Sequence, residues 1–175
     1  VSMDLRLGPK AYRIQCSFLP ENEPVETKLK EVSLYDFDIT EGGILEKNAI
    51  YLIPLMEELA LPPSLYGLAN PKSSTGRLDM FTRVIVDDGH RFDEIPNGYH
   101  GKLYLEIISR SFPVKIHAGL SLNQLRISNV TSQSLNKEKM MIKYEKNPIL
   151  FDKEGTAIPV DEVKVEEGVY VSVDV

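Results

Sequence analysis

One short segment, PKSSTGR at residues 71–77, combines hydroxyl and cationic side chains on a predicted bend. Serine is favoured at helix N-caps, where its hydroxyl satisfies a free backbone N–H. A helix N-terminus also carries partial positive charge, which suits a phosphate group. Lys72 before the cap and Arg77 one turn later would add two cationic donors, and Gly76 would allow close approach to the backbone. The segment predicts an anion site, with an ordinary solvated turn as the alternative.

A second segment, NGYHGKLYLEIISR at residues 97–110, predicts a strand with a glutamate in its middle. Side chains alternate along a strand, so Glu106 shares a face with Lys102 and Tyr104. The opposite face carries an apolar row that consists of Leu103, Leu105 and Ile107. If other elements cover the face of Glu106, its carboxyl group is a candidate for proton transfer. If that face is open to water, Glu106 is an ordinary solubilising charge, and the residues leave both readings open.

Other catalytic patterns are missing from the sequence. Zinc-dependent nucleobase deaminases need His-x-Glu and Pro-Cys-x-x-Cys motifs, which one cysteine cannot supply. The three histidines show no ligand spacing, so we expect no protein-bound metal. The phosphate-binding patterns GxxxxGK[ST] and GxGxxG are absent. A Ser–His–Asp triad stays open, although no nucleophile elbow is present.

Composition restricts the partners and the compartment. A net charge of −6 and a pI near 5.2 argue against a nucleic-acid-binding protein, so a bound anion must be held by a local cluster. The single cysteine, Cys16, excludes an intrachain disulfide and fits a reducing compartment, and we expect it to be buried. No apolar run approaches the ~20 residues of a membrane span, and no signal peptide is recognisable. We therefore expect a soluble cytoplasmic protein. Because residue 1 is valine, we also expect an N-terminal piece to be missing.

The chain reads as short β-runs separated by turn residues, which predicts a single all-β domain over residues 1–175. Helical turns are predicted at LMEELA (55–60) and SSTGRL (73–78). SLNKEKMMIKYEKN (134–147) is either a helix or an exposed arm. The predicted strands are 4–7, 11–18, 44–55, 65–70, 80–87, 102–108, 113–117, 121–127 and 169–175.

Four segments, taken together, resemble the dCTP deaminase and dUTPase superfamily, and more closely its dCTP deaminase branch. They are SMDLRLG (2–8), PKSSTGR (71–77), GYHGKLYLEI (98–107) and AGLSLNQLRI (118–127). The resemblance implies a distorted β-barrel of the dUTPase-like, or β-clip, type with one or two short helices. It also implies a homotrimer or higher homo-oligomer with active sites between subunits. The chain further resembles the first half of a variant in which two such domains are fused.

This resemblance implies hydrolytic deamination of dCTP to dUTP and ammonia without zinc, with Mg²⁺ bound only through the triphosphate. Glu106 matches the glutamate that activates water and shuttles its proton to the leaving amine. Ser73 matches the serine that positions this water, and Arg77 the arginine beside the reacting base. The residues implied in nucleotide binding are Lys72, Ser74, Gly98, Tyr99 and Gln124.

The segment before Gly98 departs from the family pattern. The chain is several residues longer than usual between Arg77 and Gly98, and the family's Asp-Pro-Gly is here residues 96–98, Pro-Asn-Gly. The nearest upstream acids are Asp93 and Glu94. In the dUTPase branch an aspartate near this point activates water for pyrophosphate cleavage. Two alternatives therefore stay open: a dUTP diphosphatase or bifunctional deaminase-diphosphatase, and a non-catalytic nucleotide-binding or scaffolding domain.

Overall fold

The structure is a computed structural model that describes residues 2–129 and 137–164. The chain divides into two compact units, residues 1–130 and 131–175. The four segments that carry the family resemblance all lie in the first unit. The single domain over 1–175 stays a prediction, and the strand predicted at 169–175 lies outside the described residues.

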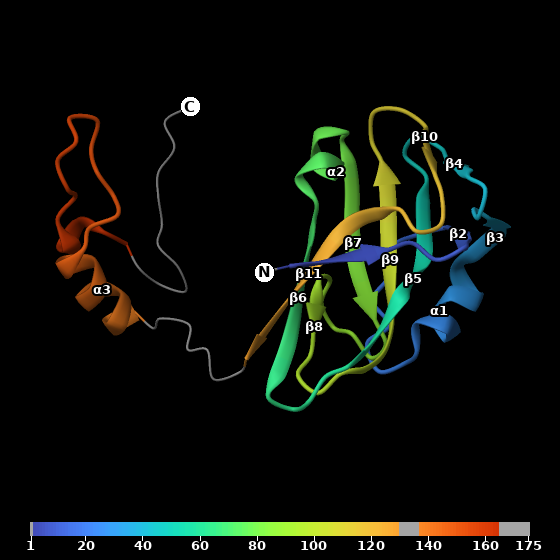
Figure 1. The fold of residues 1–175 in the computed structure, drawn as a ribbon, viewed down its shortest axis with the longest axis horizontal. Coiled ribbons are helices and arrows are strands. Elements are labelled where there is room, and N and C mark those ends of the chain that lie inside the picture. Colours follow the sequence, from blue (N-terminus) through green and yellow to red (C-terminus); the bar gives the residue numbers. More distant parts are fainter. Residues whose placement is uncertain (1, 130–136, 165–175) are drawn as a thin grey trace. The chain divides into compact units, whose positions relative to one another are not determined.

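Antiparallel sheets form the first unit (Figure 1). The largest has five strands in the order β3 (Ser33–Asp38), β2 (Lys10–Ile14), β5 (Ile50–Ala60), β9 (His100–Ser109) and β7 (Met80–Val86). A second sheet has the order β1 (Met3–Arg6), β11 (Ser121–Asn129), β6 (Leu65–Pro71) and β8 (Glu94–Ile95). The third sheet pairs β10 (Val114–Ile116) with β4 (Gly43–Leu45). The predicted all-β class is confirmed.

Both faces of β9 are buried. Leu105 and Ile107 belong to a core cluster that also holds Leu5 and Leu125 from the second sheet, so this core lies between the two larger sheets. Tyr104 belongs to a second cluster on the other face of β9. The alternation predicted for this strand is therefore confirmed, and a covering layer exists on each side of it.

The helix α1 (Val25–Val32) supplies part of the second layer. Val25 and Leu29, one turn apart, are its buried residues. Glu26 in its first turn and Lys30 in its last turn match the helix dipole. Sequence reasoning did not predict α1.

Three expectations about single elements have different outcomes. The turn predicted at SSTGRL is confirmed as α2 (Ser73–Arg77). The helical turn predicted at 55–60 is wrong, because β5 continues to Ala60 and pairs with β9 across an irregularity between Pro54 and Glu58. Cross-strand pairing outweighs the helix propensity of this segment. The expectation for Cys16 is also wrong, since this residue is exposed.

The second unit contains α3 (Lys137–Lys146) and the 3₁₀ helix η1 (Val160–Glu162), so the ambiguous segment is helical over residues 137–146. Tyr144 is buried, and its hydroxyl lies 2.8 Å from the carbonyl oxygen of Ile158 and 3.2 Å from that of Leu150. Among the described residues, no helix has both the length and the apolar character that a membrane crossing requires.

Candidate active site

Glu106 occupies the centre of the largest sheet. It lies opposite Leu52 on β5 and opposite Arg83 on β7. Its exposed fraction is 0%, because the second core cluster covers its face of β9. Glu106 is therefore not a solubilising surface charge, and the alternative of a covered carboxyl group is correct.

The Glu106 carboxylate forms an ion pair with Arg83. The Arg83 Nε donates to Oε1 of Glu106 at 3.0 Å, and Nη2 donates to the same oxygen. Nη2 also donates to the Ser17 hydroxyl at 2.7 Å. The second carboxylate oxygen, Oε2, is buried and has no hydrogen-bond partner in the described part of the chain. One oxygen is thus held by a cation, while the other is buried and has no hydrogen-bond partner among the described residues.

The segment between β7 and β9 covers this ion pair. The Arg83 Cζ lies 3.8 Å from the ring centroid of Phe92 and 5.0 Å from that of Phe81. Next to Phe92, the Asp93 carboxylate accepts a hydrogen bond from the Val84 backbone N–H at 2.8 Å. Burial raises the pKa of Asp93, while the Val84 N–H and the Arg83 charge act in the opposite direction. Asp93 is thus a second carboxyl group whose pKa responds to the charges of Arg83 and Glu106.

The predicted anion segment is attached to the second sheet. The Thr75 hydroxyl donates to the Leu122 carbonyl oxygen at 2.7 Å, which ties α2 to β11. Lys72 is the N-cap, without a side-chain cap bond, so the expectation that a serine caps this helix is wrong. The side chains of Ser73, Ser74 and Arg77 are exposed.

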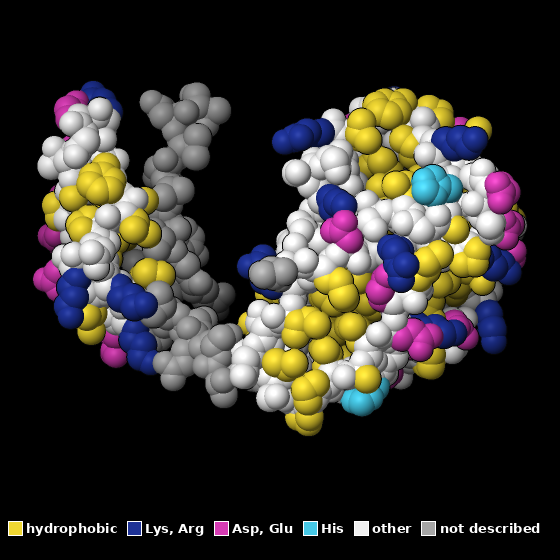
Figure 2. Space-filling view, in the orientation of Figure 1, with side chains coloured by type: hydrophobic (Ala, Val, Ile, Leu, Met, Phe, Trp, Pro, Cys, Tyr) yellow, Lys and Arg dark blue, Asp and Glu magenta, His cyan; other side chains and the backbone are white. Residues whose placement is uncertain are grey.

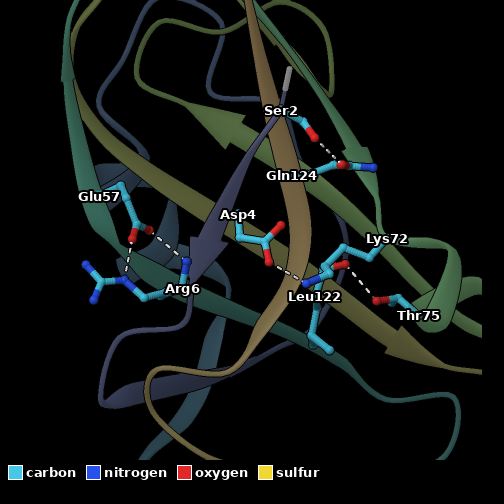
Figure 3. A network of polar contacts seen from close by, with 8 residues as sticks. All are labelled: Ser2, Asp4, Arg6, Glu57, Lys72, Thr75, Leu122 and Gln124. Carbon is cyan, nitrogen blue, oxygen red and sulfur yellow. Dashed lines mark hydrogen bonds and ion pairs between the residues drawn. The ribbon is translucent and has the colours of Figure 1, made fainter.

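Lys72 is not a free cation. Its ammonium group forms an ion pair with Asp4 on β1 (Figure 3). Asp4 lies opposite Gln124 in the register of β1 and β11, and the Gln124 Oε1 accepts a hydrogen bond from Ser2 at 2.6 Å. A hollow of about 400 Å³ lies here, lined by Ser2, Asn70, Gln124 and Arg126. Lys72 and Gln124 thus both lie next to Asp4 on β1.

Gly98 and Tyr99 form the turn that leads into β9. Gly98 has a φ of +70°, in the left-handed region that glycine adopts readily. Tyr99 is 8% exposed, and its hydroxyl donates to the Lys102 carbonyl oxygen at 2.6 Å. Burial raises the pKa of Tyr99 to about 12. These contacts fix the start of the strand that carries Glu106.

Within one chain, Glu106 and α2 lie on different sides of β7. Thr82 is buried, and its hydroxyl accepts a hydrogen bond from the Asn123 amide on β11 at 3.3 Å. The next residue, Arg83, has its side chain on the opposite face, where it meets Glu106. α2 packs on the side of Thr82, because it is bonded to β11. In the described ranges 2–129 and 137–164, no hydrogen bond joins Glu106 to Ser73 or Arg77.

The surface and the side-chain clusters add two observations. Figure 2 shows basic and acidic side chains interspersed on the visible face of the first unit rather than gathered by sign. Among the residues that the structure describes, no group of three or more His, Cys, Asp or Glu side chains is placed to hold a metal ion. A bound anion would thus depend on local donors, such as those near Lys72.

Comparisons with known proteins identify relatives of this chain. A family model, the 2'-deoxycytidine 5'-triphosphate deaminase N-terminal domain, matches residues 1–131. The "dCTP deaminase" of Ignicoccus hospitalis is 32% identical over 97 residues, which cover 54% of this chain and 49% of that protein. The "dCTP deaminase, dUMP-forming" of a Sulfurihydrogenibium species is 27% identical over 138 residues, covering 76% and 70%.

A solved structure shows the same fold. The crystal structure of 2'-deoxycytidine 5'-triphosphate deaminase from Agrobacterium tumefaciens matches with a TM-score of 0.75 and 44% identity. The match covers 87% of this chain and 45% of that one. The chain thus spans about half the length of this structure and of the Ignicoccus protein. The fold that the family resemblance implied is confirmed.

Proposed function

The chain belongs to the dCTP deaminase N-terminal domain family, and we propose that it supplies the proton-transfer carboxylate of a hydrolytic dCTP deaminase. The observation that carries this proposal is the state of Glu106, which is fully buried and has one oxygen, Oε2, without a partner among the described residues. A fixed acid or base of this kind contributes about 10²–10⁴-fold to a reaction rate.

The reaction requires one carboxyl group to act twice. Glu106 accepts a proton from water while the water oxygen bonds to C4 of the cytosine ring and the π pair of the C4=N3 bond moves to N3. The same carboxyl group then gives this proton to the exocyclic nitrogen, and the C4–N bond breaks to release ammonia. The second water proton ends on ring N3, so the products are dUTP and ammonia. Because Glu106 acts first as a base and then as an acid within one turnover, a single glutamate can serve both proton transfers.

The proposal includes a second subunit. Ser73 and Arg77 lie across β7 from Glu106, so α2 of another copy, as in a homotrimer, would bring a hydroxyl and a guanidinium to the same base. Lys72, Ser74 and Gln124 are the proposed contacts to the triphosphate. We place this oligomer in the cytoplasm, in line with its single cysteine.

Magnesium enters this proposal only with the nucleotide, and zinc does not enter it. Since the described residues offer no cluster of three metal-ligating side chains, phosphate oxygens rather than protein carboxylates would hold the Mg²⁺ ion. The ion supplies charge neutralisation for the triphosphate.

Ammonia release from dCTP and Mg²⁺ by the full-length protein tests the proposal. Glu106→Gln should abolish turnover but leave dCTP binding largely intact, because the amide keeps the size of the side chain and loses proton transfer. Glu26→Gln is the matched control, since Glu26 is an exposed carboxylate paired with Lys102. A folded oligomer that releases no ammonia contradicts the proposal. Bound dCTP together with an unchanged rate for Glu106→Gln favours the non-catalytic scaffolding domain.

A bifunctional enzyme is a second candidate, and Asp93 favours it. Its half-buried carboxyl group lies close enough to Arg83 and Glu106 for their charges to act on its pKa. A relative is named "dCTP deaminase, dUMP-forming". Pyrophosphate release from dCTP, lost in Asp93→Asn while ammonia release continues, would establish this activity. Ammonia without pyrophosphate excludes it.

A further inference from the structure

We infer that Arg83 is a positioning residue for Glu106, which orients the carboxylate so that Oε2 alone is available for the proton. This inference rests on the proposed function. Two guanidinium donors, Nε and Nη2, converge on the same oxygen, Oε1. An arginine often binds both oxygens of a carboxylate in parallel. Because the pairing here uses one oxygen, it fixes the carboxylate and leaves Oε2 unpartnered among the described residues.

The contacts around Arg83 hold its guanidinium in place. Ser17, which follows β2, accepts a hydrogen bond from Nη2 at 2.7 Å. The Phe92 ring lies over the guanidinium at 3.8 Å, and Phe81 lies on the same strand as Arg83 at 5.0 Å. Cation–π contacts and a hydrogen bond from separate segments restrict the side chain in different directions. Glu106 is therefore oriented by a residue that is itself fixed.

Arginine suits this role because its charge does not change during the reaction. A carboxylate with 0% exposure is costly unless a cation compensates it. A guanidinium stays protonated at any ordinary pH, so Arg83 compensates the charge without giving its own proton to the substrate. The Arg83 side chain is 23% exposed, whereas Glu106 is fully buried. Arg83 thus acts through Glu106 rather than on the base itself.

Steady-state ammonia release by variants of the full-length protein tests this inference. Arg83→Met should lower kcat by about 100-fold or more, the lower end of what a positioned acid or base contributes, with KM changed by less than about threefold. Arg83→Lys should recover part of kcat, because it restores the charge but not the two-donor geometry. Lys102→Met is the matched control: it removes a cation from an exposed ion pair on β9 and should leave kcat unchanged.

A further variant covers the case in which Arg83→Met does not fold. Ser17→Ala keeps the ion pair but removes one contact of Nη2, so kcat should fall several-fold at unchanged KM, with only a small decrease in melting temperature. Wild-type kcat in both Arg83→Lys and Ser17→Ala, or losses confined to KM, would overturn the inference while the wild-type enzyme stays active. A wild-type protein that releases no ammonia overturns the proposed function and this inference together.

Discussion

Asp4 and Lys72 lie 68 residues apart in the sequence, yet their ion pair joins β1 to the N-cap of α2. The contact occupies the cation that sequence reasoning assigns to the triphosphate. If Lys72 contacts the triphosphate as proposed, the nucleotide would compete with this carboxylate for the lysine. On that proposal, Asp4 would control nucleotide affinity.

Replacement of Asp4 by Asn should tighten dCTP binding by up to about fivefold, since an exposed ion pair is worth ~0.2–1 kcal/mol. Calorimetric titration of the free protein measures this affinity. Deoxycytidine, which has no phosphates, should bind equally to both forms. Asp36→Asn is the control variant, because Asp36 pairs with Lys10 in a similarly exposed contact. Weaker dCTP binding by Asp4→Asn would contradict the assignment of Lys72.

The pair formed by Arg83 and Glu106 should show strong coupling in a double-mutant cycle. Arg83→Met leaves a buried carboxylate without its cation and should lower the free energy of unfolding by about 3–5 kcal/mol. Addition of Glu106→Gln removes the unpaired charge, so the double variant should be more stable than the sum of the single losses predicts. Urea denaturation supplies the four values. Additive losses would show that the two side chains do not stabilise each other.

Tyr99 should make the protein less stable in alkali. Burial raises its pKa from 10.0 to about 12, so the folded state keeps a proton that the unfolded state has released. The unfolded state then binds fewer protons than the folded one, and the free energy of unfolding falls as the pH rises from about 10 to about 12. The loss is on the order of 2–3 kcal/mol. Below pH 10 this contribution is fully present.

Tyr99→Phe removes the ionisable hydroxyl and should flatten the alkaline part of the stability curve. The variant also loses the hydrogen bond to the Lys102 carbonyl, so its stability at neutral pH should be lower by ~1 kcal/mol. Denaturation at several pH values between 8 and 12 separates the two effects. An unchanged slope above pH 10 would mean that Tyr99 does not titrate with folding.

Two glycines should respond in opposite ways to alanine. Gly98 has a φ of +70°, so Gly98→Ala should destabilise the protein by ~1–2 kcal/mol. Gly76 lies in α2, and a Cβ there meets no atom within 4 Å, so Gly76→Ala should stabilise the protein by up to ~1 kcal/mol. Thermal melting measures both. If Gly76→Ala nevertheless impairs dCTP binding, the bare backbone at this position serves the ligand.

The sequence predicts the site only in part, because local sequence patterns do not show which residues of neighbouring strands lie opposite each other. Alternation along β9 correctly separates Glu106 from Leu105. The contacts that hold Arg83, the partner of Glu106, come from Ser17 and Phe92, which lie in irregular segments without periodicity. Helix α1 has a detectable signal, with Val25, Leu29 and Val32 spaced at helical intervals after Pro24, that sequence reasoning overlooked.

The partners of charged residues are the hardest features to predict. Arg83 is one of several basic residues in the sequence, and only the register between β7 and β9 places it opposite Glu106. The Asp4–Lys72 pair likewise depends on the meeting of β1 and β11. Such contacts join strands that are distant in sequence, so propensity and spacing cannot indicate them.

Asp93 binds Val84 twice, through its backbone N–H at 2.9 Å and through its carboxylate at 2.8 Å. The segment after β7 is therefore fastened back onto β7 just beyond Phe92. Insertions or deletions at the exposed residues His90 and Arg91 would leave the attachment of Asp93 to β7 in place. Insertions and deletions can thus accumulate there during evolution while the aromatic cover of Arg83 is preserved.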